Sequence, residues 1–150
     1  MNLMDIFENV HRDDPETVIR PDGWRCANDV PQSWSRPGCL YRGMSEAEYR
    51  STVGAGLPLK SDGRYCLAGE GTCFAEDATD AESYVNFGHT DPRISGKPNY
   101  LIEIEADSSI KKDKDGYWKA PTVSLDRIRR VWKMYARGSE IVALRIGTGG

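Results

Sequence analysis

The chain has 150 residues, of which 39% are hydrophobic and 29% are charged, and its formal net charge at pH 7 is −3. These values predict one soluble domain and exclude a disordered tail, and no apolar run is long enough to span a membrane. The start of the chain, MNLMDIFENVHRDD, is acidic and unlike a secretory signal. We therefore expect a cytoplasmic protein with no membrane partner.

Residues 1–38 are expected to form an N-terminal helix and an irregular arm. The segment NLMDIFENV carries its apolar residues at helical spacing, which predicts a short amphipathic helix. The segment from 11 to 38 contains four prolines as well as Trp24 and Trp34. Proline removes backbone donors and tryptophan supplies burial, so this arm is predicted to wrap around the domain or to act as a lid.

Two strand–helix units follow the arm. The run CLYRGM at 39–44 predicts a strand, and SEAEYRSTVGAG predicts a helix, because Ser45 and Glu48 have capping-box spacing. The run TCFAED at 72–77 predicts a second strand, and ATDAESYVNFG predicts a second helix that ends at Gly88. Cys39 and Cys73 lie in apolar runs and are expected to be small core residues.

The last third of the chain is rich in strand signals. The alternation in NYLIEIEAD predicts a half-buried strand with Glu103 and Glu105 on one exposed face. The segment RRVWKMYARGSEIVALRI predicts an antiparallel hairpin with Gly138 in its turn. Because helices concentrate early and strands late, we predict a single α+β domain over 1–150, with its core at 39–150 and a mostly antiparallel sheet.

The stretches LYRGMSEAEY and GEGTCFAEDATDAESYV resemble the front half of the ADP-ribosyltransferase superfamily, including its small bacterial and phage members. In that family an aromatic-Arg-Gly strand end precedes a helix, and a small-hydroxyl-aromatic strand precedes a helix with an A..Y pattern. The resemblance covers residues 39 to 88, and the C-terminal strands more loosely. It implies a split antiparallel sheet with short helices and NAD as the substrate of a mono-ADP-ribosyltransferase or NADase that modifies an unidentified macromolecule.

The resemblance also implies roles for individual residues. Arg42 would hold the pyrophosphate, because a bidentate guanidinium suits phosphate oxygens, and Gly43 would let the ligand approach the backbone. Thr72 would support the site, and a carboxylate, Glu103 or Glu105, would act on the ribose or the acceptor, where positive charge develops. The other expected NAD contacts are Tyr41, Phe74 and Tyr84.

The position of the catalytic carboxylate is left open by the sequence. In the family a glutamate precedes a late strand, and the corresponding segment here, Tyr117–Lys119, is not acidic. Asp113 and Asp115 in the preceding loop are further candidates. Some NAD-degrading toxins offer another match, in which Arg42 acts with the segment DGRY at 62–65 and with Glu82.

Other functions and partners also stay open. A non-catalytic nucleotide- or macromolecule-binding module on the same fold, such as a small phage effector or inhibitor acting through its surface, would need no such glutamate. A protein is the favoured partner, and the basic strand Arg127–Arg137 gives nucleic acid as the second option. No metal is expected, because the four cysteines contain no C-x-x-C pair and the two histidines lack ligand spacing.

Overall fold

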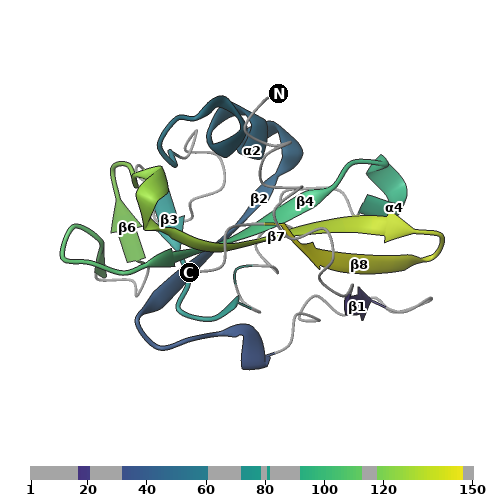
Figure 1. The fold of residues 1–150 in the computed structure, drawn as a ribbon, viewed down its shortest axis with the longest axis horizontal. Coiled ribbons are helices and arrows are strands. Elements are labelled where there is room, and N and C mark those ends of the chain that lie inside the picture. The colour runs from purple at the N-terminus through teal and green to yellow at the C-terminus, as the bar shows by residue number, and fades with distance from the viewer. Residues whose placement is uncertain are drawn as a thin grey trace.

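Two antiparallel sheets form the frame of the protein (Figure 1). The computed structural model describes residues 17–20, 32–60, 72–78, 81, 92–112 and 118–146. The large sheet has the order β1-β8-β7-β4-β2 and the small sheet the order β3-β6-β5. The strands are β1 Thr17–Arg20, β2 Cys39–Ser45, β3 Thr72–Phe74, β4 Asn99–Glu105, β5 Lys111–Lys112, β6 Trp118–Ala120, β7 Ile128–Arg137 and β8 Glu140–Arg145. The helices are short: α2 Glu46–Ser51, α4 Pro92–Ser95 and the 3-10 turns η1 Gln32–Trp34, η2 Val53–Ala55 and η3 Leu125–Arg127. The predicted α+β class with a mostly antiparallel sheet is confirmed.

The large sheet is built around the predicted strands. β4 pairs with β2 on one side and with β7 on the other, so it lies inside the sheet. β7 and β8 form the predicted hairpin, in which Gly138 has a φ of 61° that suits glycine. At the tip of this hairpin the Arg93 side chain of α4 donates to the Ser139 carbonyl at 3.0 Å, which fixes α4 beside the turn (Figure 1).

The helix α2 begins where the sequence predicts it. Ser45 is the N-cap, and its side-chain oxygen accepts from the Glu48 amide at 3.2 Å. The Glu48 carboxylate, which a capping box would direct back to the cap, instead accepts from the guanidinium of Arg42. The chain then turns through η2 and leaves it at Gly56, which has a φ of 71°.

Apolar clusters cover both faces of the large sheet. One cluster packs α2, η2 and the small sheet against the first face and contains Leu40, Met44, Tyr49, Val53, Leu59, Phe74, Tyr100, Ile102, Ile104, Ile110, Ala120, Val123, Ile128, Val131 and Ile146. The second cluster contains Tyr41, Ala78, Ala81, Leu101, Trp132, Met134, Ile141 and Ala143, with Trp34 packed against it. We call these the α2 face and the Trp132 face of the sheet.

β4 is therefore buried on both of its faces. Every residue of this strand before Glu105 is buried, so the prediction of a half-buried strand was wrong. The reason lies outside the strand, because Trp34 and the segment with Ala78 and Ala81 cover the face that the alternation assigned to solvent. Glu103 lies inside that cover, while Glu105 stays exposed at the end of the strand.

Three short strands had no strong signal in the sequence. β1 lies in the predicted arm and pairs with β8. β5 and β6 join β3 in the small sheet, which meets the large one where Tyr41 of β2 bridges Ala75 (Figure 1). In the part of the chain that the structure describes, no helix is long and apolar enough to cross a membrane.

Several predictions from the sequence fall outside the described residues. They concern the helix at 2–10, Trp24, the segment DGRY at 62–65, Glu82, Tyr84, Asp113 and Asp115. Of the second predicted helix, Ala78 and Ala81 are described, and both are helical and buried. Cys39 is a free thiol, but Cys73 takes part in a disulfide and is therefore not the free core thiol that we expected.

Candidate functional site

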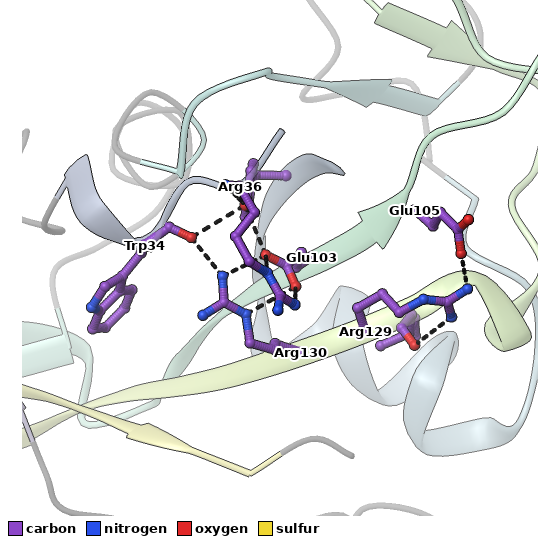
Figure 2. A network of polar contacts seen from close by, with 8 residues as sticks. Trp34, Arg36, Glu103, Glu105, Arg129 and Arg130 are labelled. Carbon is purple, nitrogen blue, oxygen red and sulfur yellow. Dashed lines mark hydrogen bonds and ion pairs between the residues drawn. The ribbon is translucent and has the colours of Figure 1, made fainter. Parts of the chain in front are cut away.

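Glu103 is the centre of a buried polar cluster on the Trp132 face (Figure 2). Its side chain is 0% exposed, and it accepts hydrogen bonds from three residues. The Tyr41 hydroxyl lies 2.7 Å from Oε2, and Arg130 donates to both oxygens, through Nε at 2.9 Å and Nη2 at 2.6 Å. Arg36 also donates two hydrogen bonds to this carboxylate, through its Nε and Nη2. Two guanidinium groups thus bind one carboxylate in an apolar setting.

A β-bulge brings the arginines to the carboxylates. Glu103 lies opposite Arg130, but Ile104 lies opposite Ile128, so Arg129 is an extra residue in β7. Without a bulge, the consecutive residues Arg129 and Arg130 would point to opposite faces. Here Arg129 pairs with Glu105 while Arg130 pairs with Glu103, so the E-x-E of β4 is matched by the R-R of β7 (Figure 2).

The charges in this cluster determine how it titrates. Burial by itself raises the pKa of Glu103, but the hydrogen bonds from Arg130, Arg36 and Tyr41 outweigh it, so this pKa is lowered from its ordinary value. Burial, together with the hydrogen bond to Glu103, raises the pKa of Tyr41. At neutral pH Glu103 is therefore an anion and Tyr41 a neutral donor. Such a carboxylate is an electrostatic anchor rather than a base with a free lone pair.

This titration predicts a loss of stability in acid. Because the folded-state pKa of Glu103 is lowered, its contribution is present above the ordinary glutamate pKa, about 4.3, and is lost as pH falls through the lower folded value. The free energy of unfolding, measured by urea titration between pH 7 and pH 3, should fall below that point. Glu103→Gln should make this fall shallower, because the variant has no carboxylate there. Parallel pH profiles for the two proteins would contradict the assignment.

The segment Trp34–Arg36, which we call the strap, lies across the cluster. The Trp34 indole stacks on Trp132 with centroids 4.7 Å apart and an interplanar angle of 9°. The backbone carbonyl of Trp34 accepts from Arg130 Nη2 at 2.5 Å, and the Arg36 amide donates to the Tyr41 hydroxyl at 2.7 Å. The strap is thus held by ring, backbone and charge contacts at once.

The strap also contacts the chain that follows β3. Ser35 Oγ accepts from the Ala78 amide at 2.9 Å. Among the described residues, the segments that cover the Trp132 face are therefore joined to each other as well as to the sheet. This contact explains how the end of the predicted arm becomes part of the core.

Trp34→Ala should loosen the strap while leaving the sheet folded. A stacked aromatic pair contributes about 0.5–1.5 kcal/mol beyond its buried area, so we expect a loss of about 1–3 kcal/mol in the free energy of unfolding. Hydrogen exchange should quicken at the amides of Arg36 and Ala78, because the strap holds both. Trp118→Ala, in the small sheet, is the control, and it should leave those two amides protected. Unchanged exchange in Trp34→Ala would contradict this role.

Arg42 lies on the other face of the sheet. Its Nε and Nη2 donate to the two oxygens of Glu48 at 2.8 and 2.7 Å, and its Nη1 donates to the Cys73 carbonyl at 2.9 Å. The side chain is 5% exposed. Arg42 therefore ties β2 to α2 and to β3, so that the cation proposed for phosphate is already engaged by an internal carboxylate.

The structure separates the predicted site residues into two groups. On the α2 face, Arg42 lies near β3, where Thr72 and Phe74 are buried and the Thr72 hydroxyl donates to the Pro121 carbonyl at 3.3 Å. Tyr41 pairs directly with Glu103 across β2 and β4, whereas Arg42 pairs with Ile102. Because neighbouring residues of a strand point to opposite faces, both glutamates lie on the face opposite to Arg42.

Two further candidates, Gly43 and Tyr41, also lie on β2. Gly43 of β2 pairs with Leu101 of β4 and is half-buried. Tyr41 is fully buried and acts through its hydroxyl in the Glu103 cluster, so it does not present a ring to the α2 face. The Arg42, Thr72 and Phe74 group is thus brought together, and Glu103, Glu105 and Tyr41 form a separate group.

The basic strand proposed for nucleic acid is paired with carboxylates. Its ion pairs join Arg127 to Asp107, Arg129 to Glu105, Arg130 to Glu103 and Arg137 to Glu140. These partners offset the positive charge that the sequence suggests for β7. Among the residues that the structure describes, no group of histidine, cysteine, aspartate and glutamate side chains could hold a metal ion.

Sequence reasoning did not place Trp34, Arg36 and Arg130 in one site. The signal that could have indicated the cluster is a glutamate between two isoleucines, in LIEIE, combined with the R-R pair of the hairpin. A charge in the middle of an apolar strand needs a counter-charge if that strand is central.

Comparison with models of known protein families, with curated proteins and with solved structures finds no match to this chain.

Proposed function

We propose that the protein is a non-catalytic binding module that acts on a protein partner through its surface, on a scaffold that resembles the ADP-ribosyltransferases. The carboxylate partners of the arginines at 127–137 favour a protein over nucleic acid as the partner. One observation carries the non-catalytic part of the proposal. The groups that NAD turnover would require, Arg42 and the glutamates of β4, lie on opposite faces of the sheet and are each held by internal partners. Arg42 on one face cannot hold the pyrophosphate of an NAD molecule whose nicotinamide ribose lies against a glutamate on the other face.

The energetics of the Arg42 pair support the same conclusion. A phosphate that took Arg42 from Glu48 would leave a nearly buried carboxylate without its counter-charge. Breaking a buried pair in this manner costs about 3–5 kcal/mol. At about 1.4 kcal/mol for each factor of ten, this weakens binding by roughly two to three and a half orders of magnitude. The internal pair thus competes strongly against an anionic ligand.

A second candidate function is a mono-ADP-ribosyltransferase or NADase that uses NAD as its substrate and modifies a macromolecule. The observation that favours it is the junction of the two sheets, where Tyr41 bridges Ala75 and Arg42 reaches the Cys73 carbonyl. Gly43 follows directly on β2 and would let a nucleotide approach the backbone. This candidate requires that the ligand displaces Glu48 and that a carboxylate outside the described residues completes the site.

Incubation of the purified protein with NAD separates the two functions. We expect no release of nicotinamide above the background of a buffer control, with or without candidate protein and nucleic-acid acceptors. The matched control variants are Arg42→Lys, which alters the buried arginine, and Arg50→Lys, whose side chain is 58% exposed and pairs with Glu46. Nicotinamide release that Arg42→Lys abolishes and Arg50→Lys preserves would overturn the non-catalytic proposal in favour of the second candidate.

A further inference from the structure

We propose that the Trp132 face is a peptide-binding site for an aromatic-x-arginine segment of a partner protein, and that the strap occupies this site in cis. This inference rests on the proposed function, because it names the partner that the binding module would recognise. The observation behind it is that Trp34 and Arg36 of the strap both contact the sheet, each through its side chain and its backbone. The receptor side consists of Tyr41, Glu103, Arg130 and Trp132, which β2, β4 and β7 supply.

The receptor groups contact one another as well as the strap. Arg130 donates two hydrogen bonds to Glu103 from the neighbouring strand, and Tyr41 donates to the same carboxylate from the other side. The Arg130 guanidinium also lies 4.5 Å from the centroid of the Trp132 ring. When the strap leaves, the buried Glu103 keeps a counter-charge and a hydroxyl donor. The site is therefore preorganised, which favours the binding of a segment from outside.

The contacts of the strap define the chemistry of its replacement. The first position supplies an aromatic ring for Trp132 and a carbonyl for Arg130. The third position supplies a backbone amide for the Tyr41 hydroxyl and a side chain that reaches Glu103 through two nitrogens, Nε and Nη2. Lysine has a single nitrogen and cannot form this fork, so the site selects arginine. The middle position, where Ser35 lies, accepts a small residue that can bond the Ala78 amide.

In this proposal the strap exchanges with the partner segment, and two features of the strap favour the exchange. The Arg36 side chain is 41% exposed even though it reaches a fully buried carboxylate. Pro37 and Gly38 connect the strap to β2, and Gly38 has a φ of 78°, so a short turn separates the two. A tethered segment competes with an effective concentration of the order of millimolar. A partner therefore displaces the strap when it adds contacts beyond the aromatic-x-arginine segment.

Peptide complementation tests this site. The full chain with Trp34→Ala and Arg36→Ala is titrated by calorimetry with an end-capped peptide of the strap sequence, QSWSRPG. We expect saturable binding that is at least tenfold tighter than binding to the wild-type chain, in which the strap competes. The same peptide should raise the melting temperature of the double variant. A peptide with lysine in place of arginine should bind at least tenfold more weakly.

Each other outcome is decisive. Circular dichroism confirms that the double variant folds, and if it does not, the single variant Arg36→Ala takes its place in the titration. No saturable binding to the folded variant overturns the inference, as does equal binding to the same variant with Glu103→Gln added, once circular dichroism shows that it is folded. Dimers that appear with rising wild-type concentration, and that Arg36→Ala abolishes, would assign the site to a second copy instead of a partner protein. Nicotinamide release overturns the proposed function alone, whereas absent binding without turnover overturns this inference alone.

Discussion

Glu103→Gln lowers the free energy of unfolding by about 3–5 kcal/mol, the largest loss that we expect from a single substitution. Glutamine keeps the shape of the side chain but leaves the Arg130 guanidinium, whose side chain is largely buried, without a counter-charge. The amide also turns one acceptor into a donor that faces two arginines. For a domain of this size the melting temperature should fall by roughly 6–20 °C.

Glu105→Gln is the matched control for this substitution. Glu105 lies two residues along the same strand and pairs with Arg129, but its side chain is 49% exposed. Exposed pairs contribute about 0–1 kcal/mol, so this variant should unfold close to the wild type. The losses in the free energy of unfolding of the two variants, measured by urea denaturation at pH 7, should therefore differ by several-fold. Similar losses for the two variants would show that Glu103 is not the anchor of the cluster.

Arg42→Met has the second largest expected effect, a loss of about 2–4 kcal/mol in the free energy of unfolding. The side chain fills similar space, but Glu48 loses its bidentate partner and the Cys73 carbonyl loses a donor. Helix α2 should also loosen against β2, because Arg42 is the charged contact between them. Hydrogen exchange at the Thr52 amide, which closes the last turn of α2, reports this loosening.

A double-mutant cycle with Glu48→Gln isolates the pair. If the two side chains stabilise the protein through each other, the second substitution should cost less in the background of the first, by about 1–3 kcal/mol. Arg50→Met is the matched control, because Arg50 lies on the same helix as Glu48 and forms an exposed pair with Glu46. Additive losses for Arg42 and Glu48 would contradict a structural role of this pair.

The features that the sequence predicts correctly are local ones. The strand at 39–44, the Ser45 cap and the hairpin around Gly138 depend on alternation, side-chain capping and turn geometry within a few residues. These signals are complete in the chain itself, so they need no knowledge of distant packing. The class of the fold follows from their order along the chain.

The site was beyond sequence reasoning because it depends on distant contacts. The alternation of β4 is compatible with an exposed Glu103, and the burial of this residue comes from Trp34, which lies 69 positions earlier (103 minus 34). The bulge at Arg129 leaves no mark in a sequence that alternates on either side of it. The resemblance placed Arg42 at a strand end, which was wrong because β2 continues to Ser45, and it could not show that Glu48 already occupies the Arg42 guanidinium.

The short strands illustrate the same limit. β5 has two residues and β6 has three, too few for an alternation to be read. β1 lies among prolines that suggest an arm, and its place beside β8 is set by pairing across more than 100 residues. Such elements form because a sheet edge is available, and this cannot be deduced from four residues.

We infer that Arg42 is a structural cation held by Glu48 and not a free binder of phosphate. Nuclear magnetic resonance of the arginine Nε–H groups during a titration with NAD tests it most directly. We predict that the Arg42 Nε–H signal is protected from exchange with water and stays in place up to millimolar NAD, and that it shifts in Glu48→Gln. A saturable shift of this signal in the wild-type protein on adding NAD, with loss of its protection, would contradict the account.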